Sequence, residues 1–222
     1  MSSYIFMKIL ESAPQRYDRG IQILTLGKWD RAYDRLVSCL QKGQKALDIG
    51  CGTGAFALKA AQKGAQVKGI DINPQMLKLA REKAKAKDLE SLTQFEEKGV
   101  SELDEEETAA YDAVFSGLCF SELSQDEIHY TLGQIKRILK KKGLLLVADE
   151  VRPPHLFHDI LHWMIKIPLL LVTYLITQTS TRAVKNLPQR IERAGFLIER
   201  KRVSKLQDFM ELTARKAGKN TE

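Results

Sequence analysis

The sequence predicts an α/β fold with a mostly parallel sheet covered by helices on both faces. Strand-like apolar runs alternate with amphipathic helical runs five times along the chain, which is typical of a parallel sheet. A glycine-rich turn at residues 50–54 joins the first strand to its helix. Two strand-like runs, 196–203 and 209–214, follow one another at the end of the chain and are expected to close the sheet.

Length and charge limit the class of protein. The 222 residues suffice for a sizeable core, and we expect residues 1–222 to form a single domain. The formal net charge of +7 favours anionic surfaces as partners, either nucleic acid or lipid headgroups. Basic residues are spread over many helices and only 7% of residues are aromatic, so we do not expect a dedicated nucleic-acid face.

The three cysteines, Cys39, Cys51 and Cys119, have neither the spacing of a disulfide framework nor that of a metal site. They suit a reducing compartment and are expected to pack as small apolar groups. The first eight residues lack the basic start and long apolar core of a secretory signal. We therefore expect a cytoplasmic protein.

The N-terminal segment, about 1–43, is expected to form a helical cap that is interrupted near Pro14 and Gly20. Its last helix, Trp29–Leu40, has one apolar face. Two interpretations stay open. The cap either covers one end of the sheet or closes over a bound ligand, with Tyr17 facing the pocket.

The first four strands are predicted from apolar runs with helices between them. Pro74 occupies the first turn of one helix, where its missing N–H is tolerated. Asp71 ends the second strand, about 20 residues after the glycines, which is a spacing typical of nucleotide sites. Strands are expected at 45–49, 66–71, 92–96 and 111–116, and helices at 55–63 and 74–88.

The second half continues the alternation. A capping box of Ser124 and Glu127 starts a helix that is expected to reach about Lys140. The segment 140–143 supplies the positive charge and the glycine typical of a helix end, so the fifth strand is expected at 144–149. A helix at 187–194 precedes the final pair of strands.

The segment from about 151 to 188 interrupts this pattern. Within it, Ile160–Ile176 is strongly apolar but contains Lys166 and Pro168, and it is shorter than the ~20 apolar residues of a membrane span. We expect an apolar lid over the active site, which can seat residues 156–178 as a peripheral contact on the inner membrane face. A pair of core helices is the alternative.

The glycine turn and Asp71 form a nucleotide-binding pattern. The glycines let the backbone bend sharply and a ligand approach closely, and the carboxylate can hold a ribose diol. A dinucleotide and S-adenosylmethionine both fit such a turn. The dinucleotide pattern has its third glycine three residues after the second, whereas Gly52 and Gly54 are two apart. Asp48, just before the turn, can receive an ammonium group.

Three stretches, Leu47–Gly54, Gly69–Met76 and Tyr111–Ser116, resemble motifs of the class I S-adenosylmethionine-dependent methyltransferases. The resemblance covers most of residues 12–215. It implies a Rossmann-like sheet of seven strands with an antiparallel final strand, S-adenosyl-L-methionine as cofactor, and adenine packed on Ile72. The cofactor-binding residues that it implies are Asp48, Gly50, Cys51, Gly52, Gly54, Asp71, Ile72, Gly99, Val100, Ser116, Gly117 and Leu118.

One departure from the family concerns the end of the third strand, where many relatives carry an aspartate that accepts the adenine amino group. Gly99 stands there in this sequence. Recognition of adenine then falls to backbone groups around Gly99 and Val100, or to Ser101.

Methyl transfer mainly requires alignment of donor and acceptor, and a base is needed only for some acceptors. The histidines of the lid share one helix face, but no second ligand cluster accompanies them, so no metal site is assigned. We select Glu122, His158 and Tyr17 as catalytic candidates. The wider set of candidate bases is Glu122, Asp149, Glu150, His155, His158 and His162.

Resemblance also suggests an acceptor. Tyr17-Asp18, the stretch 24–27 and the apolar lid resemble the ubiquinone/menaquinone-biosynthesis methyltransferase group, whereas Ser116–Leu123 looks more like small methyltransferases associated with corrinoid proteins. Our hypothesis is methyl transfer to a lipophilic, quinone- or lipid-like small molecule. The alternatives are a protein-bound cofactor of the corrinoid type or a nucleic acid as acceptor, and a non-catalytic protein that binds S-adenosylmethionine.

Overall fold

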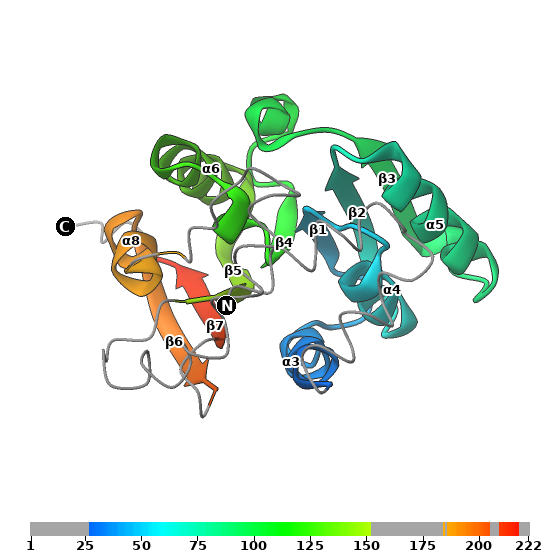
Figure 1. Cartoon of the computed structure of the whole chain (residues 1–222), viewed down its shortest axis with the longest axis horizontal. Helices are drawn as coiled ribbons and strands as arrows, with labels where there is room; N and C mark the ends of the chain where they lie inside the picture. The colour runs from blue at the N-terminus through cyan, green and yellow to red at the C-terminus, as the bar shows by residue number, and fades with distance from the viewer. Residues whose placement is uncertain (1–26, 152–183, 185, 205–208, 218–222) are drawn as a thin grey trace, which may run out of the picture.

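The computed structural model describes residues 27–151, 184, 186–204 and 209–217. They form a seven-stranded sheet of order β3-β2-β1-β4-β5-β7-β6 (Figure 1). The α/β class and the number of strands agree with the sequence prediction. The strands are β1 (Lys45–Ile49), β2 (Gln66–Asp71), β3 (Thr93–Glu97), β4 (Tyr111–Gly117), β5 (Leu139–Glu150), β6 (Phe196–Val203) and β7 (Phe209–Lys216).

Strand β1 lies in the middle of the sheet and pairs in parallel with both β2 and β4. Strands β3 and β5 extend the sheet outward, also in parallel. The strand order therefore reverses between β1 and β4, and ligands bind at the carboxyl ends of strands at such a switch point. Four of the five residues of β1 are buried, as expected for a central parallel strand.

Strand β7 lies between β5 and β6 and is antiparallel to both. The reversed final hairpin that the resemblance implied is thereby confirmed. Strand β6 forms the edge of the sheet, and its outer half, from Glu199 to Val203, carries exposed and mostly charged side chains. Charged residues on an edge strand discourage pairing with another chain.

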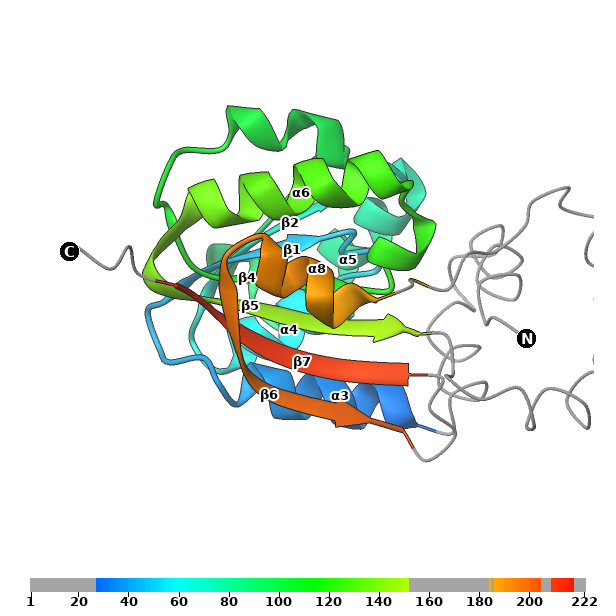
Figure 2. The same cartoon turned by 90° about the vertical axis from the view of Figure 1, so that its left-hand side faces the viewer.

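Helices cover both faces of the sheet (Figure 2), and an apolar layer lies between the helices and each face. On one face, α3 (Lys28–Val37), α4 (Ala55–Gln62) and α5 (Pro74–Lys85) contribute buried aromatic and small side chains. On the other face, α6 (Gln125–Ile138) and α8 (Leu187–Arg193) contribute isoleucine and leucine. Short 3-10 turns, η1 (Glu90–Leu92), η2 (Val100–Glu105) and η3 (Phe120–Glu122), connect some of these elements.

Most helices and strands lie within a few residues of their predicted ranges, but β5 starts at Leu139 rather than at Leu144. The residues between them form an irregular strand, in which Lys142 has a left-handed backbone with φ of 66°. Lys140 Nζ binds the two carboxylate oxygens of Asp112 at 2.8 and 2.9 Å. Leu139 pairs with Tyr111 of β4 and the pairing resumes at Leu144 opposite Ala113, so residues 140–143 interrupt the ladder; the helix ends at Ile138, two residues before the expected end.

Several predicted features lie outside the described residues: the first part of the helical cap, most of the lid, Tyr17 and His158. In the part of the chain that the structure describes, no helix is both long and apolar enough to cross a membrane. The same described ranges contain no group of three or more side chains suited to hold a metal ion.

Candidate functional site

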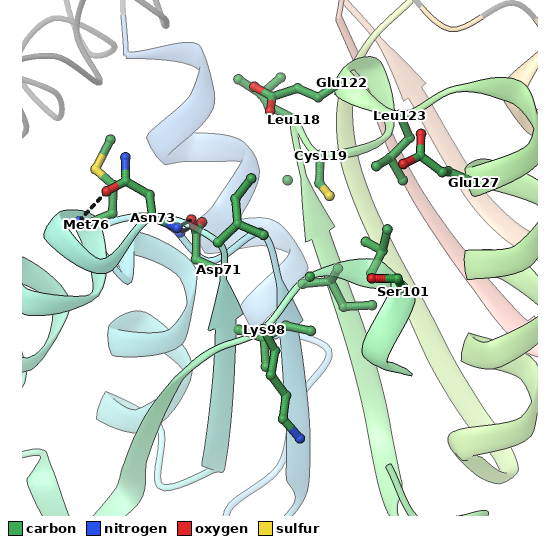
Figure 3. A pocket seen from close by; sticks show the side chains of 18 of the residues that line it. Asp71, Asn73, Met76, Lys98, Ser101, Leu118, Cys119, Glu122, Leu123 and Glu127 are labelled. Carbon is green, nitrogen blue, oxygen red and sulfur yellow. Dashed lines mark hydrogen bonds between the residues drawn. The ribbon is translucent and has the colours of Figure 1, made fainter. Parts of the chain in front are cut away.

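A cavity of about 510 Å³ lies at the carboxyl ends of β1, β2 and β4 (Figure 3). Its walls come from the glycine turn, the residues that follow β2 and β3, and the segment between β4 and α6. The cavity therefore occupies the switch point of the sheet, where the fold places ligands.

The glycine turn has the backbone conformation that the sequence predicts. Gly50, Gly52 and Gly54 have positive φ values of 68°, 52° and 77°, a region that other residues rarely adopt. The N–H of Gly50 donates to the Ile70 carbonyl at 2.9 Å, which ties the turn to β2. A Cβ on Gly50 would lie 3.0 Å from Cys119 Cβ, so a side chain there would displace the segment after β4.

Asp71 is held in place by two backbone groups. Its Oδ2 accepts the N–H of Gly52 and its Oδ1 accepts the N–H of Asn73, both at 2.8 Å. Asn73 caps α5 by accepting the N–H of Met76 at 3.3 Å (Figure 3). Because each carboxylate oxygen can accept more than one hydrogen bond, Asp71 keeps acceptor capacity toward the cavity. A rigid carboxylate beside the turn is suited to bind a diol.

Ile72 is 73% exposed, although large apolar side chains are usually buried. It lines the cavity next to Gly99, where an added Cβ would lie 3.3 Å from Ile72 Cγ2. The absence of a side chain at Gly99 keeps the space beside Ile72 open. This apolar surface can cover one face of a flat aromatic ring.

The start of η2 forms the adjoining wall. The N–H of Gly99 donates to Glu102 Oε2 at 2.8 Å, and the N–H of Glu102 donates to the Gly99 carbonyl at 3.2 Å. These two bonds engage both backbone groups of Gly99 within the turn. Val100 and Ser101 also line the cavity, and the first N–H groups of a helical turn have no partner inside it.

The tip of β4 continues the wall on the other side. Leu118 is buried in a left-handed conformation with φ of 54°, and its N–H donates to the Ala148 carbonyl at 2.9 Å. Cys119 and Glu122 follow and line the cavity (Figure 3). Desolvation raises the pKa of the Cys119 thiol, and the carboxylates near it, first that of Glu122, raise it further. The thiol therefore stays protonated and is a poor nucleophile.

Asp48 is buried at the end of β1, with 1% of its surface exposed. Neither carboxylate oxygen has a hydrogen-bond partner among the described residues. Burial raises the pKa of Asp48 well above its usual value; the nearby N–H of Ala57 offsets this only in part, and the charge of Asp71 adds to it. A buried carboxylate without partners is costly unless a ligand supplies them.

The structure brings most of the predicted cofactor residues together. Those that line the cavity are Gly50, Gly52, Asp71, Ile72, Gly99, Val100, Gly117 and Leu118, together with the catalytic candidate Glu122. Asp48, Cys51, Gly54 and Ser116 lie behind the wall instead. Cys51 and Ser116 are buried, and Gly54 begins α4, where a Cβ would lie 3.1 Å from Ala80 Cβ.

Sequence reasoning missed other residues of the wall. Asn73 carried a signal as the residue before Pro74, because it caps the helix that Pro74 begins. Lys98 lines the cavity by its stem, while its ammonium pairs with Glu105 at 2.8 Å (Figure 3). The further lining residues that were not predicted are Ile49, Ile70, Pro74, Met76, Cys119, Leu123 and Glu127. For Cys119, Leu123 and Glu127 no local pattern pointed to the site, because only the pairing of β1 with β4 brings their segment to the turn.

Comparison with known proteins gives a consistent result. Residues 46–143 match a family model described as a methyltransferase domain. The demethylmenaquinone methyltransferase of Thermus thermophilus is 37% identical over 150 residues, which are 65% of this chain and 64% of that protein. The chain spans 59–60% of the length of the first curated relatives that it matches.

Solved structures share the fold at low sequence identity. A geranyl diphosphate methyltransferase in complex with SAM superposes with a TM-score of 0.67 over 91% of each chain, at 11% identity. The cyclase SpnF superposes with a TM-score of 0.68 over 85% of this chain and 81% of its own, at 20% identity. These two proteins are named for different reactions, so the fold by itself does not decide the chemistry.

Proposed function

We propose that the chain, whose residues 46–143 match a methyltransferase domain, transfers a methyl group from S-adenosyl-L-methionine to a lipophilic small molecule of the quinone type. The observation that carries the proposal is the pairing, in one cavity, of a backbone-bound Asp71 with the exposed Ile72 beside it. Adenosine presents a ribose diol next to a flat ring, and the neighbouring residues Asp71 and Ile72 offer a carboxylate for the diol and an apolar surface for the ring.

The residues of the site fit this cofactor at both of its ends. At the nucleoside end, Asp71 would accept the ribose hydroxyls and Ile72 would cover the adenine, whose edge would meet Val100 and Ser101. At the amino-acid end, Asp48 would receive the ammonium group, directly or through water, and so gain the partners that it lacks. A pyrophosphate would instead bring further negative charge toward Asp48 and Asp71.

The protein contributes to the reaction mainly by positioning the methyl donor and the acceptor. When bound, S-adenosylmethionine supplies a methyl group on a positively charged sulfur, and alignment with the acceptor accounts for much of the rate gain. Gly117 and Leu118 would form the wall beside that sulfur. Glu122 lines the same cavity and would accept the proton of a phenolic acceptor, the role for which it was selected from the sequence.

Two observations support the acceptor class: the relatives that the chain resembles and the lid that the sequence predicts. Demethylmenaquinone methyltransferases are 31–37% identical to this chain over about two thirds of its length. The sequence predicts that residues 151–188 form an apolar lid, which would suit a lipophilic acceptor better than a polar metabolite. We also propose that residues 156–178 contact the membrane surface from which such an acceptor would be taken.

The cofactor assignment is tested by titration calorimetry with S-adenosylmethionine, and with NAD as the competing nucleotide. The wild-type protein should bind the former and not the latter. Asp71→Ala should weaken binding by at least about a hundredfold, because two hydrogen bonds to a charged group are lost. Asp112→Ala removes a carboxylate at the opposite end of the sheet and should leave the affinity unchanged. Equal affinities in the wild type and Asp71→Ala would contradict the ribose assignment.

The acceptor is tested by incubating the protein with methyl-labelled cofactor and separate lipid, protein and nucleic-acid fractions of a cell extract. Label should enter the lipid fraction and depend on Glu122, so that Glu122→Gln lowers kcat more than it raises the KM for the cofactor. Label in protein or nucleic acid alone would refute the lipophilic acceptor. Co-sedimentation with anionic vesicles tests the membrane contact, and it should be absent when the apolar residues of 160–176 are replaced by serine.

A further inference from the structure

Tyr33 lies behind the cavity, at a position that the sequence did not single out. Its side chain is buried and packs edge-on against Trp29, Phe56 and Phe115, with ring centroids 5.2, 5.8 and 4.9 Å away. Phe56 and Phe115 stack on each other at 3.6 Å. Three aromatic neighbours fix the ring of Tyr33, and the position of its hydroxyl is fixed with it.

The hydroxyl of Tyr33 abuts the tip of β4. A Cβ built on Gly117 would lie 2.2 Å from Tyr33 Oη, a distance that no side chain can adopt. Gly117 itself lines the cavity. The phenol oxygen therefore takes the space that a side chain at residue 117 would otherwise fill, and it supports the wall of the cavity from behind.

Ion pairs at both sides of α3 keep Tyr33 in this place. Arg35 binds Glu211 of β7 through two hydrogen bonds of 2.8 and 2.5 Å. Lys59 of α4 pairs with Asp30 at 2.9 Å and with Asp34 at 2.5 Å. Bidentate contacts of an arginine with a largely buried carboxylate restrict geometry more than exposed pairs do. These ion pairs hold helix α3 against the sheet and against α4, the helix that follows the glycine turn.

The supported wall faces the amino-acid end of the proposed cofactor. Asp48 of β1 pairs with Phe115 of β4 in the parallel register, so their side chains lie on the same face of the sheet. Gly117 lies two residues beyond Phe115 and faces the same side. Tyr33 and Gly117 therefore lie on the same face of the sheet as Asp48, whereas Ile72, one residue after Asp71, lies on the other face.

We propose that Tyr33 is a positioning residue for the amino-acid end of bound S-adenosylmethionine. Its hydroxyl sets how closely the tip of β4 approaches the glycine turn, and so fixes the space in which the aminobutyrate group lies. This role rests on the proposed function, because it needs the cofactor to bind with its amino-acid end at Asp48. It adds a residue from α3 to a site otherwise built from the strand tips.

Three ligands separate this role from a general effect on folding. S-adenosylmethionine and S-adenosylhomocysteine carry the aminobutyrate group, whereas methylthioadenosine lacks it. Tyr33→Phe should raise the Kd of the first two by about tenfold and change that of methylthioadenosine by less than about twofold. Tyr111→Phe is the matched control, because it removes a buried phenol oxygen that binds Glu106, remote from the cavity. It should leave all three affinities unchanged.

A second variant tests the contact itself. Gly117→Ala should weaken both aminobutyrate ligands more than Tyr33→Phe does, because its Cβ meets Tyr33 Oη. In the double variant the oxygen is gone, so affinity should recover in part, limited by the ring of Phe115 at 2.8 Å from that Cβ. The proposal is overturned by no loss in Tyr33→Phe, by an equal loss for all three ligands, or by additive effects in the double variant. If the wild type binds none of the ligands, the proposed function fails instead.

Discussion

Replacing Asp48 by asparagine should stabilise the folded protein at neutral pH and weaken S-adenosylmethionine binding. The carboxylate is buried without a hydrogen-bond partner among the described residues, and its burial raises its pKa well above the usual 3.8. Asparagine has nearly the same shape but carries no charge. The carboxylate that would bind the ammonium group therefore destabilises the folded protein when no ligand is bound.

The magnitude follows from proton linkage. Below pH 3.8 the carboxyl group is protonated in both the folded and the unfolded chain, so its titration has no effect on stability. Between that pH and the raised native pKa, only the unfolded chain releases the proton. The free energy of unfolding then falls by about 1.4 kcal/mol for each pH unit. Because asparagine does not titrate, the advantage of Asp48→Asn should grow by about 1.4 kcal/mol for each pH unit within that interval.

Urea denaturation of the wild type and Asp48→Asn at several pH values from 4 to 8 measures this difference. Asp112→Asn is the control with the opposite sign. Burial acts to raise the pKa of Asp112, but its bonds with Lys140 Nζ and the Lys45 N–H leave that pKa lowered. The stability that this carboxylate contributes is present above its usual pKa and is lost as the pH falls through the lowered value. A destabilised Asp48→Asn at pH 8, or a difference that does not change with pH, would refute the reasoning.

Three further predictions concern single positions. Ile72→Ser should leave the free energy of unfolding within about 0.5 kcal/mol, because the side chain is 73% exposed, yet raise the Kd for S-adenosylmethionine several-fold in calorimetry. Gly50→Ala should abolish measurable binding through its positive φ and its contact with Cys119, whereas Gly133→Ala, in open space on α6, should raise the stability by about 0.5–1 kcal/mol without altering affinity. Ser124→Ala should cost about 1 kcal/mol in urea denaturation, because it removes the N-cap of α6.

The sheet could be predicted from the sequence because its strands are apolar runs bounded by turn signals. The bounds of β1, β2 and β6 match the predicted ranges. The start of β5 could not be predicted in this way. Lys142 and Gly143 have the charge and the glycine of a helix end, and only the pairing of Leu139 with Tyr111 of β4 starts the strand before them. Such long-range pairing overrides local signals.

In the candidate site, too, residues placed by local contacts could be predicted and residues placed by long-range contacts could not. The glycine turn and Asp71 could be predicted because their geometry is set by neighbours within one strand–turn–helix–strand unit. Cys119 and Glu127 reach the cavity only because β4 lies beside β1, which the local sequence does not specify. Tyr33 depends on still more distant contacts, since α3 is placed by an ion pair with β7 near the end of the chain.

The two ends of the cavity differ in how much they destabilise the protein when no ligand is bound. At the nucleoside end, Asp71 is bound by backbone N–H groups and Ile72 is open to solvent, so little stability depends on a ligand. At the other end, a buried carboxylate without partners and the left-handed Leu118 both raise the free energy of the folded chain. A ligand that fills only the nucleoside end leaves the cost of Asp48 in place. A ligand with an ammonium group offsets that cost, so the protein can favour the complete cofactor over its nucleoside fragment without any further contact.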